Sequence, residues 1–315
     1  MKVIHIGFGK TATSTLQLVL FPEIANLFSK EYINGGDARI RCHVARMALD
    51  KKANLKNLMP DQFLVSSEDL CSWDPFFWEV WADMNLGFFG SDSHILLTIR
   101  EPKSYLTAVY LQTCLHEGNV QPANDFFLGN EEYSPYLATA KFAIDEFSYT
   151  RIIDLYRTRF NKVTVVKYES LQSMEFLKDV FGLEDVELAK YQEAFSAKRV
   201  NQSYSKRSVR LTFAFQRSLE RIGLSIMPMV FYGATLDLKS LRSENKVVTK
   251  SSENRNPISN FLNKVLQNMK WRSLMHRMDI YFPSPKYQLE FEALPQINLE
   301  KLVSEYDSLP DLSTK

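Results

Sequence analysis

The chain of 315 residues is 45% hydrophobic and 24% charged, a composition typical of a globular protein with a sizeable core. The formal net charge of +1 excludes a strong overall field for nucleic acid or an anionic membrane, so any anion site has to be local. No apolar stretch reaches the roughly 20 residues of a membrane span, and three scattered cysteines argue against a disulfide framework and a zinc site, so we expect a cytoplasmic protein.

Apolar runs alternate with amphipathic stretches through the first two-thirds of the chain. The expected strands are residues 2–8, 61–69, 93–100 and 162–168, and the expected helices are residues 13–21, 103–117 and 148–160. Pro22 is expected to open a second helical segment after the first helix. Strands that alternate with helices in this way predict an α/β fold, in which helices cover both faces of a parallel sheet.

After residue 182 the pattern becomes mostly helical, with helices expected at residues 187–195 and 205–222. Helices are also expected to close over the sheet in residues 261–315, with a frayed tail after Pro310. Together these features predict a single domain over residues 1–315, with a core at about 2–215 and a helical extension at 216–315 that includes an exposed loop near 235–258.

The turn after the first expected strand contains the letters GKT, which are typical of a nucleotide-binding loop. A Walker A loop, G-x-x-x-x-G-K-[ST], would require a glycine at Ile4, inside the strand, so the turn is not that motif. Small residues can instead aim several N–H groups at one phosphate at the start of a helix, and a lysine adds a full charge. The candidate phosphate ligands are Gly9, Lys10, Thr11, Ala12, Thr13, Ser14 and Thr15.

A single lysine beside hydroxyl side chains suits a 5′-phosphate or phosphosulfate better than a Mg-triphosphate. The stretch resembles the 5′-phosphosulfate loop of the sulfotransferase family. The residues that match in order are Lys10, Thr11, Thr13, Ser14, Thr15, Leu16 and Gln17. Ala12 stands where the family usually has glycine. An unliganded glycine turn that happens to carry GKT is the alternative interpretation.

A second segment is also similar to this family. The expected strand 93–100 ends in Arg100, and Pro102, Tyr110 and Gln112 follow at the spacing of the segment that holds the 3′-phosphate in sulfotransferases. The serine of that segment falls at Ala108 here. Ser104, one helical turn earlier, or Thr107 can take its place.

The resemblance implies a P-loop-like parallel sheet, 3′-phosphoadenosine 5′-phosphosulfate (PAPS) as co-substrate, adenosine 3′,5′-bisphosphate (PAP) as product, and no metal. Residues 198–205 are similar to a family loop that approaches the nucleotide, which makes Arg199, Asn201 and Ser203 further candidates. The basic residues Lys206, Arg210, Arg217 and Arg221 lie on one side of the following expected helix, where a solvated face is the usual meaning.

The best candidate for a general base is Glu68, at the carboxyl end of the second expected strand, where parallel sheets place their active crevice. A carboxylate there can take the proton of the acceptor, and the resemblance implies the same role. Alternatively, Glu68 or Asp69 caps the following helix. His116 and His43 are alternative bases, and His5, on the first strand, is expected to be structural.

The resemblance therefore implies a sulfotransferase with Lys10 and Glu68 as catalytic residues and a small molecule or glycan, such as a carbohydrate with a hydroxyl or amine, as acceptor. Two other interpretations remain open. One is a nucleotide kinase with a degenerate phosphate loop, and the other is a non-catalytic nucleotide-binding protein on the same fold. No nucleic acid partner and no membrane span are expected.

Overall fold

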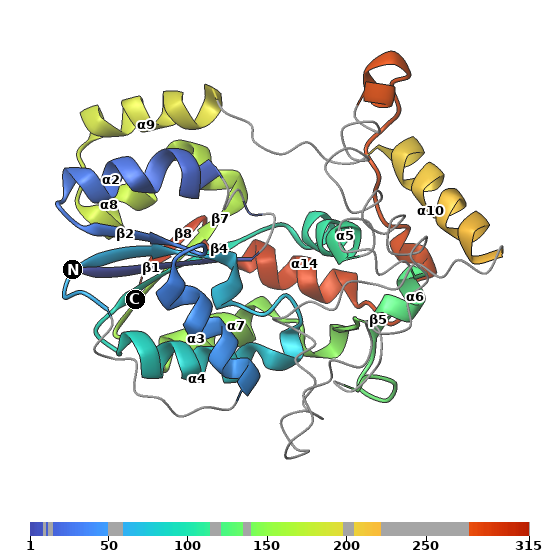
Figure 1. Ribbon diagram of the computed structural model, residues 1–315, viewed down its shortest axis with the longest axis horizontal. Helices are drawn as coiled ribbons and strands as arrows, with labels where there is room; N and C mark the ends of the chain where they lie inside the picture. The colour runs from blue at the N-terminus through green and yellow to red at the C-terminus, as the bar shows by residue number, and fades with distance from the viewer. Residues whose placement is uncertain are drawn as a thin grey trace.

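The computed structural model (Figure 1) describes residues 1–8, 11, 15–49, 59–113, 121–134, 140–197, 205–221 and 277–314. Its centre is a six-stranded sheet in the order β2-β3-β1-β4-β7-β8, in which the first five strands are parallel and β8 is antiparallel to β7. The strands are β1 (Lys2–Gly7), β2 (Glu31–Asn34), β3 (Phe63–Ser66), β4 (His94–Ile99), β7 (Lys162–Lys167) and β8 (Leu312–Thr314). The expected α/β class with a parallel sheet is therefore confirmed.

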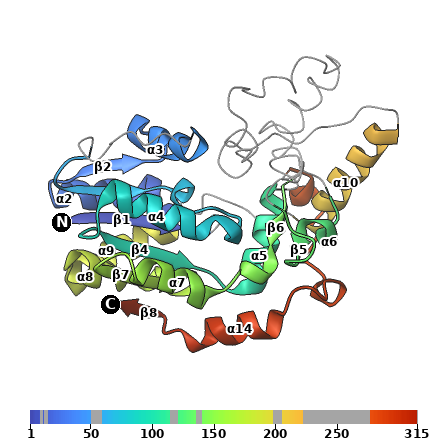
Figure 2. The ribbon, with the colours of Figure 1, turned by 90° about the horizontal axis from the view of Figure 1, so that it is seen from below.

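Helices cover both faces of the sheet (Figures 1 and 2). One face carries α2 (Phe21–Leu27), α8 (Phe176–Phe181) and α9 (Asp185–Ala197), and the other carries α3 (Ala38–Leu49), α4 (Trp78–Phe89) and α7 (Tyr149–Arg157). Beyond the carboxyl ends of the strands lie α5 (Pro102–Leu111), α6 (Ala123–Phe126), α10 (Lys206–Arg221) and the short parallel pair β5 (Phe127–Leu128) and β6 (Phe142–Ala143). The helix α14 (Leu299–Ser308) packs against α5 and α7.

Several shorter helical segments connect these elements. A π-helix covers Leu16–Leu20, and 3-10 turns cover Glu68–Leu70, Pro75–Phe77, Ile144–Glu146, Tyr168–Ser173 and Phe291–Ala293. Pro22 lies in the first turn of α2, as expected, because a proline there needs no N–H partner. None of the helices in the described ranges is long and apolar enough to cross a membrane.

The strands divide the core into two apolar layers. Successive side chains of a strand point to opposite faces, so Val3, Leu64 and Leu96 join the layer under α2, α8 and α9, whereas Ile4, Val65 and Leu97 join the layer under α4 and α7. All six residues of β4 are buried. Near-continuous apolar strands of this kind are typical of a parallel sheet that is covered on both faces.

Two strands correct the expectations from the sequence. The strand β2 was not expected, because only Ile33 of its four residues is buried and the pattern is too short to recognise. The expectation of a frayed tail after Pro310 is wrong, since Leu312 and its neighbours pair with Val166 and the residues beside it in β7.

The helix α10 runs through residue 215, where the core was expected to end. The loop near 235–258 lies outside the described residues.

A buried aspartate joins three segments at the end of the molecule that holds β6. One oxygen of Asp74 accepts hydrogen bonds from Phe76 N at 3.3 Å and Ala143 N at 3.1 Å, and the other accepts one from the Tyr133 hydroxyl. Asp74 is 3% exposed. Burial raises the pKa of the carboxyl group to about 6, although these three donors act in the opposite direction.

Candidate functional site

The parallel strands all end at the edge of the sheet that faces α5 (Figure 1). The chain leaves β1 toward β3 and β2 but leaves β4 toward β7, so the connections diverge between the neighbours β1 and β4. Open α/β sheets bind their ligands in the crevice at such a switch point. Gly7 lies opposite Thr98 in the β1–β4 register, so the loop after β1 and the segment after β4 emerge side by side.

The loop after β1 is described at Phe8, Thr11 and Thr15, whereas Gly9, Lys10, Ala12, Thr13 and Ser14 lie outside the described residues. Thr11 is fully buried. Its N–H and its hydroxyl both donate to the Phe8 carbonyl, at 3.2 Å and 2.6 Å, and its hydroxyl lies 2.8 Å from that of Thr98. Thr15, also buried, directly precedes the π-helix. The Thr11 hydroxyl therefore contacts the protein, at Phe8 and Thr98.

Arg100 follows β4 at the switch point, as expected from the sequence. Its guanidinium lies over the ring of Tyr168, 4.8 Å from the ring centroid, and its carbonyl accepts a hydrogen bond from the Tyr149 hydroxyl. Tyr168 itself follows β7, the next strand of the sheet. A contact with an aromatic face helps to hold an arginine side chain in place.

The first turn of α5 is capped from within the chain. Glu101 is the N-cap, and its carboxylate accepts from Lys103 N at 3.0 Å and Ser104 N at 2.8 Å. The N–H of Ser104 is therefore used by the cap, and the half-buried side chain is what remains for a ligand. Thr107 is buried and its hydroxyl accepts from Leu289 N at 3.3 Å. Of the two candidates to replace the family serine, Ser104 is the more accessible one.

Glu68 follows β3, the other neighbour of β1, and is exposed. The N-cap of its 3-10 turn is Ser67, whose hydroxyl accepts from Asp69 N at 3.2 Å, so the alternative that Glu68 or Asp69 is the cap is wrong. A Cβ at Gly35 would lie 2.7 Å from Ser67 Oγ and 3.4 Å from Asp69 Oδ2, which shows how closely the turn after β2 packs here. Loss of water at the Asp69 carboxyl raises its pKa.

The sequence suggests Asp69 only as a helix cap. Its place beside Glu68 makes it a second candidate for the general base. The alternative base His43 is buried between helices: its Nε2 lies 3.0 Å from Asn85 Oδ1, and its ring stacks on Phe88 with 4.2 Å between centroids. These contacts place it in the core. His116 lies outside the described residues.

The remaining candidates from the sequence lie partly beyond the described residues. Arg199, Asn201 and Ser203 fall in the undescribed segment 198–204. On α10, Arg210, Arg217 and Arg221 are exposed, as expected for a solvated face. Within the described ranges, no group of three or more histidine, cysteine, aspartate or glutamate residues is arranged to hold a metal ion.

A buried cation that was missed from the sequence follows the neighbouring strand β7, beside the half-buried Arg100. Lys167, the last residue of β7, pairs with Ile99 across the sheet and is 8% exposed. Its ammonium group lies 3.6 Å from Asp311 Oδ1 and 4.7 Å from the centroid of the Tyr306 ring. These partners come from the segment that leads into β8 and from α14, which are far from Lys167 in the sequence. The burial and the contacts of this lysine therefore could not be predicted from the sequence around it.

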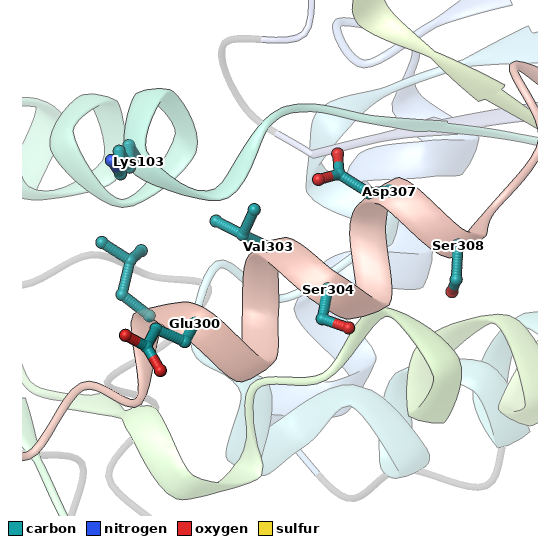
Figure 3. A pocket seen from close by; sticks show the side chains of 7 residues that line it. Lys103, Glu300, Val303, Ser304, Asp307 and Ser308 are labelled. Carbon is teal, nitrogen blue, oxygen red and sulfur yellow. The ribbon is translucent and has the colours of Figure 1, made fainter.

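A groove of about 660 Å³ separates the start of α5 from α14 (Figure 3). In Figure 3 Val303 points from α14 toward α5, which carries Lys103. Among the described residues that line the groove, Glu300 and Asp307 carry carboxylates and Lys103 is the one cation. Such a lining repels a phosphate or sulfate, and the groove is not the anion site that the sequence predicts.

The candidate site thus lies at the carboxyl ends of three neighbouring strands. The loop with Lys10 follows β1, Arg100 follows β4, and Glu68 and Asp69 follow β3. Comparisons with protein-family models, with curated proteins and with solved structures find no match, so the residues and their geometry carry the functional argument.

Proposed function

We propose that the protein is a sulfotransferase that moves a sulfuryl group from PAPS to a hydroxyl or amine of an acceptor such as a carbohydrate. The observation that carries the proposal is the adjacency of β1 and β4, with Gly7 opposite Thr98. Two segments that resemble the two phosphate-binding segments of one family therefore leave neighbouring strands at the same edge of the sheet. They do so where α/β sheets bind ligands.

The spacing suits one nucleotide with two anionic groups. Neighbouring strands lie about 4.8 Å apart, and the chain diverges beyond them, so a single ribose can present its 5′ group to the loop after β1 and its 3′-phosphate to Arg100. The contact between Arg100 and Tyr168 already restricts the arginine side chain. Less conformational entropy is then lost when a phosphate binds.

The transfer breaks the bond between sulfur and the bridging oxygen of the 5′-phosphate and forms a bond between sulfur and the acceptor oxygen or nitrogen. Negative charge grows on the bridging oxygen, where Lys10 and the loop N–H groups stabilise it. The acceptor proton passes to Glu68, or to Asp69 beside it, and PAP leaves. In the sheet order β3 and β4 lie on opposite sides of β1. The carboxylates after β3 and Arg100 after β4 would therefore approach the loop after β1 from opposite sides.

A nucleotide panel tests the donor. PAP is expected to raise the melting temperature, adenosine 5′-phosphate to raise it less, and Mg-ATP not to raise it, because ligands stabilise by binding the folded state. Stabilisation by Mg-ATP alone would favour the kinase alternative. Binding of PAP without transfer of labelled sulfate from PAPS to any glycan, phenol, lipid or peptide acceptor would favour the non-catalytic alternative.

Lys10→Ala tests the loop directly. Loss of one preorganised charge contact is expected to lower the transfer rate about 10²–10³-fold without a change in melting temperature. Lys162→Ala is the matched control, because Lys162 is an exposed lysine at the amino end of β7, whereas the Lys10 loop follows the carboxyl end of β1. Normal turnover in Lys10→Ala, or an equal loss in the control, would contradict the proposed role of Lys10.

A further inference from the structure

A chain of buried polar side chains crosses the middle of the apolar sheet. Ser66 on β3, His5 on β1, Thr98 on β4 and Thr11 in the loop after β1 are all 0% exposed. His5 Nδ1 lies 2.7 Å from Ser66 Oγ, His5 Nε2 lies 3.3 Å from Thr98 Oγ1, and Thr98 Oγ1 lies 2.8 Å from Thr11 Oγ1. Thr11 then donates to the Phe8 carbonyl at 2.6 Å.

Only one arrangement of protons satisfies this chain when the histidine is neutral. Thr11 gives its proton to the Phe8 carbonyl, so it accepts from Thr98. Thr98 has no second proton and therefore accepts from His5 Nε2–H, which leaves Nδ1 to accept from Ser66. Burial lowers the pKa of His5 to about 3, in agreement with a neutral ring. All the hydrogen bonds thus run in one direction, toward the loop.

Such a chain is costly in an apolar layer unless every member has its partner. His5 also packs its ring against Phe21 of α2, with 5.0 Å between centroids, so the Phe21 side chain restricts movement of the imidazole. The only member outside the strands is Thr11, which lies in the middle of the loop that carries Lys10. The chain therefore links three neighbouring strands to one loop residue and to the Phe8 carbonyl, where the loop begins.

We infer that His5 and Thr98 are positioning residues, which hold Thr11, in the loop after β1, against the Phe8 carbonyl. The effect on ligand binding rests on the proposed function, whereas the effect on the loop does not. The ligand class is the 5′-phosphate or phosphosulfate end of an adenine nucleotide. Thr11 is adjacent in sequence to Lys10, so we expect displacement of Thr11 to weaken the binding of this ligand.

The first test is hydrogen exchange of the unliganded protein at the amide of Thr11, which donates to the Phe8 carbonyl at 3.2 Å. Thr98→Val keeps the shape of the side chain but leaves His5 Nε2–H and Thr11 without their partner, so we expect exchange there to be at least 10-fold faster. Thr98→Ser restores the hydroxyl and is expected to restore slow exchange. Thr164→Val is the matched control, because Thr164 contacts another buried histidine, His94, at 2.8 Å in the same sheet.

The second test is the affinity for PAP. Thr98→Val is expected to raise the dissociation constant about 10-fold, while Thr98→Ser and Thr164→Val stay within about twofold of wild type. Equal changes in Thr98→Val and Thr164→Val, in exchange or affinity, would overturn the inference and leave only a general loss of stability. If no variant, including wild type, binds PAP while the exchange difference persists, the positioning role stands and the proposed function fails.

Thr11→Val serves as the second variant if Thr98→Val does not fold, because it removes the last link without a change in any strand. It is expected to speed exchange at the amide of residue 11 and to leave the amides of β1, β3 and β4 as protected as in wild type. Unchanged exchange at residue 11 in Thr11→Val would also overturn the inference.

Discussion

Lowering the pH from 7 to 5 is expected to remove about 2 kcal/mol of stability through His5 alone. The pKa of this histidine falls from 6.5 to about 3 on folding because the ring is buried. The unfolded chain therefore takes up the proton first as the pH falls, and the folded form is disfavoured. Stability from His5 is complete above pH 6.5 and is lost progressively toward pH 3. Ser66, Thr98 and Phe21 face the ring, and none of them carries a charge.

Urea unfolding at the two pH values measures the effect, and His5→Gln isolates it. The loss between pH 7 and 5 should be about 2 kcal/mol smaller in the variant than in wild type. His94, with a pKa lowered to about 4, acts in the same direction, so His94→Gln is a matched comparison. Asp74, with a pKa raised to about 6, acts in the opposite direction by about 1.4 kcal/mol at pH 5.

Nitrogen NMR of the imidazole gives the direct check. It should report a neutral ring protonated on Nε2 down to about pH 4. A ring that titrates near pH 6.5, or a His5→Gln variant that loses as much stability in acid as wild type, would refute the reasoning.

Four further substitutions have expected outcomes. Arg100→Ala should weaken the binding of PAP far more than that of adenosine 5′-phosphate in calorimetry, and equal weakening of both nucleotides would exclude Arg100 as the 3′-phosphate ligand. Ala108→Ser should tighten the binding of PAP. Glu68→Gln should keep donor affinity and melting temperature but lower turnover about 10²–10⁴-fold, and full activity would shift the role to a different base. Tyr133→Phe should cost about 1.5–3 kcal/mol in urea unfolding at pH 7.5 and less at pH 5, where Asp74 is protonated; a loss that does not depend on pH would contradict this.

The central strands were predictable because each is a run of buried apolar residues that needs no distant information. Residues 2–8, 93–100 and 162–168 contain β1, β4 and β7, and the alternation of helices between them requires a parallel sheet. Arg100 at a strand end followed from the same pattern. Its contact with Tyr168 did not, because the two residues meet only when β4 and β7 pair.

The features that escaped prediction depend on partners far along the chain. The strand β2 has one buried residue and β8 has three residues in all, so neither has a recognisable pattern without the ladder that it joins. The environment of Asp69 depends on Gly35, in the turn after β2. The inward direction of the Thr11 side chain depends on Thr98 of β4, whereas local sequence alone makes its hydroxyl an equally good phosphate ligand.

The pairing of β8 with β7 has a consequence for synthesis of the protein on the ribosome. Until residues 312–314 have left the exit tunnel, the outer side of β7 presents unpaired N–H and C=O groups, and Lys167 lacks Asp311 and Tyr306. An open edge of this kind is a template for pairing with another chain. The nascent protein therefore depends on residues 312–314 to cover this side of β7, and a ribosome that stalls before them leaves a chain whose sheet has an edge open to pairing.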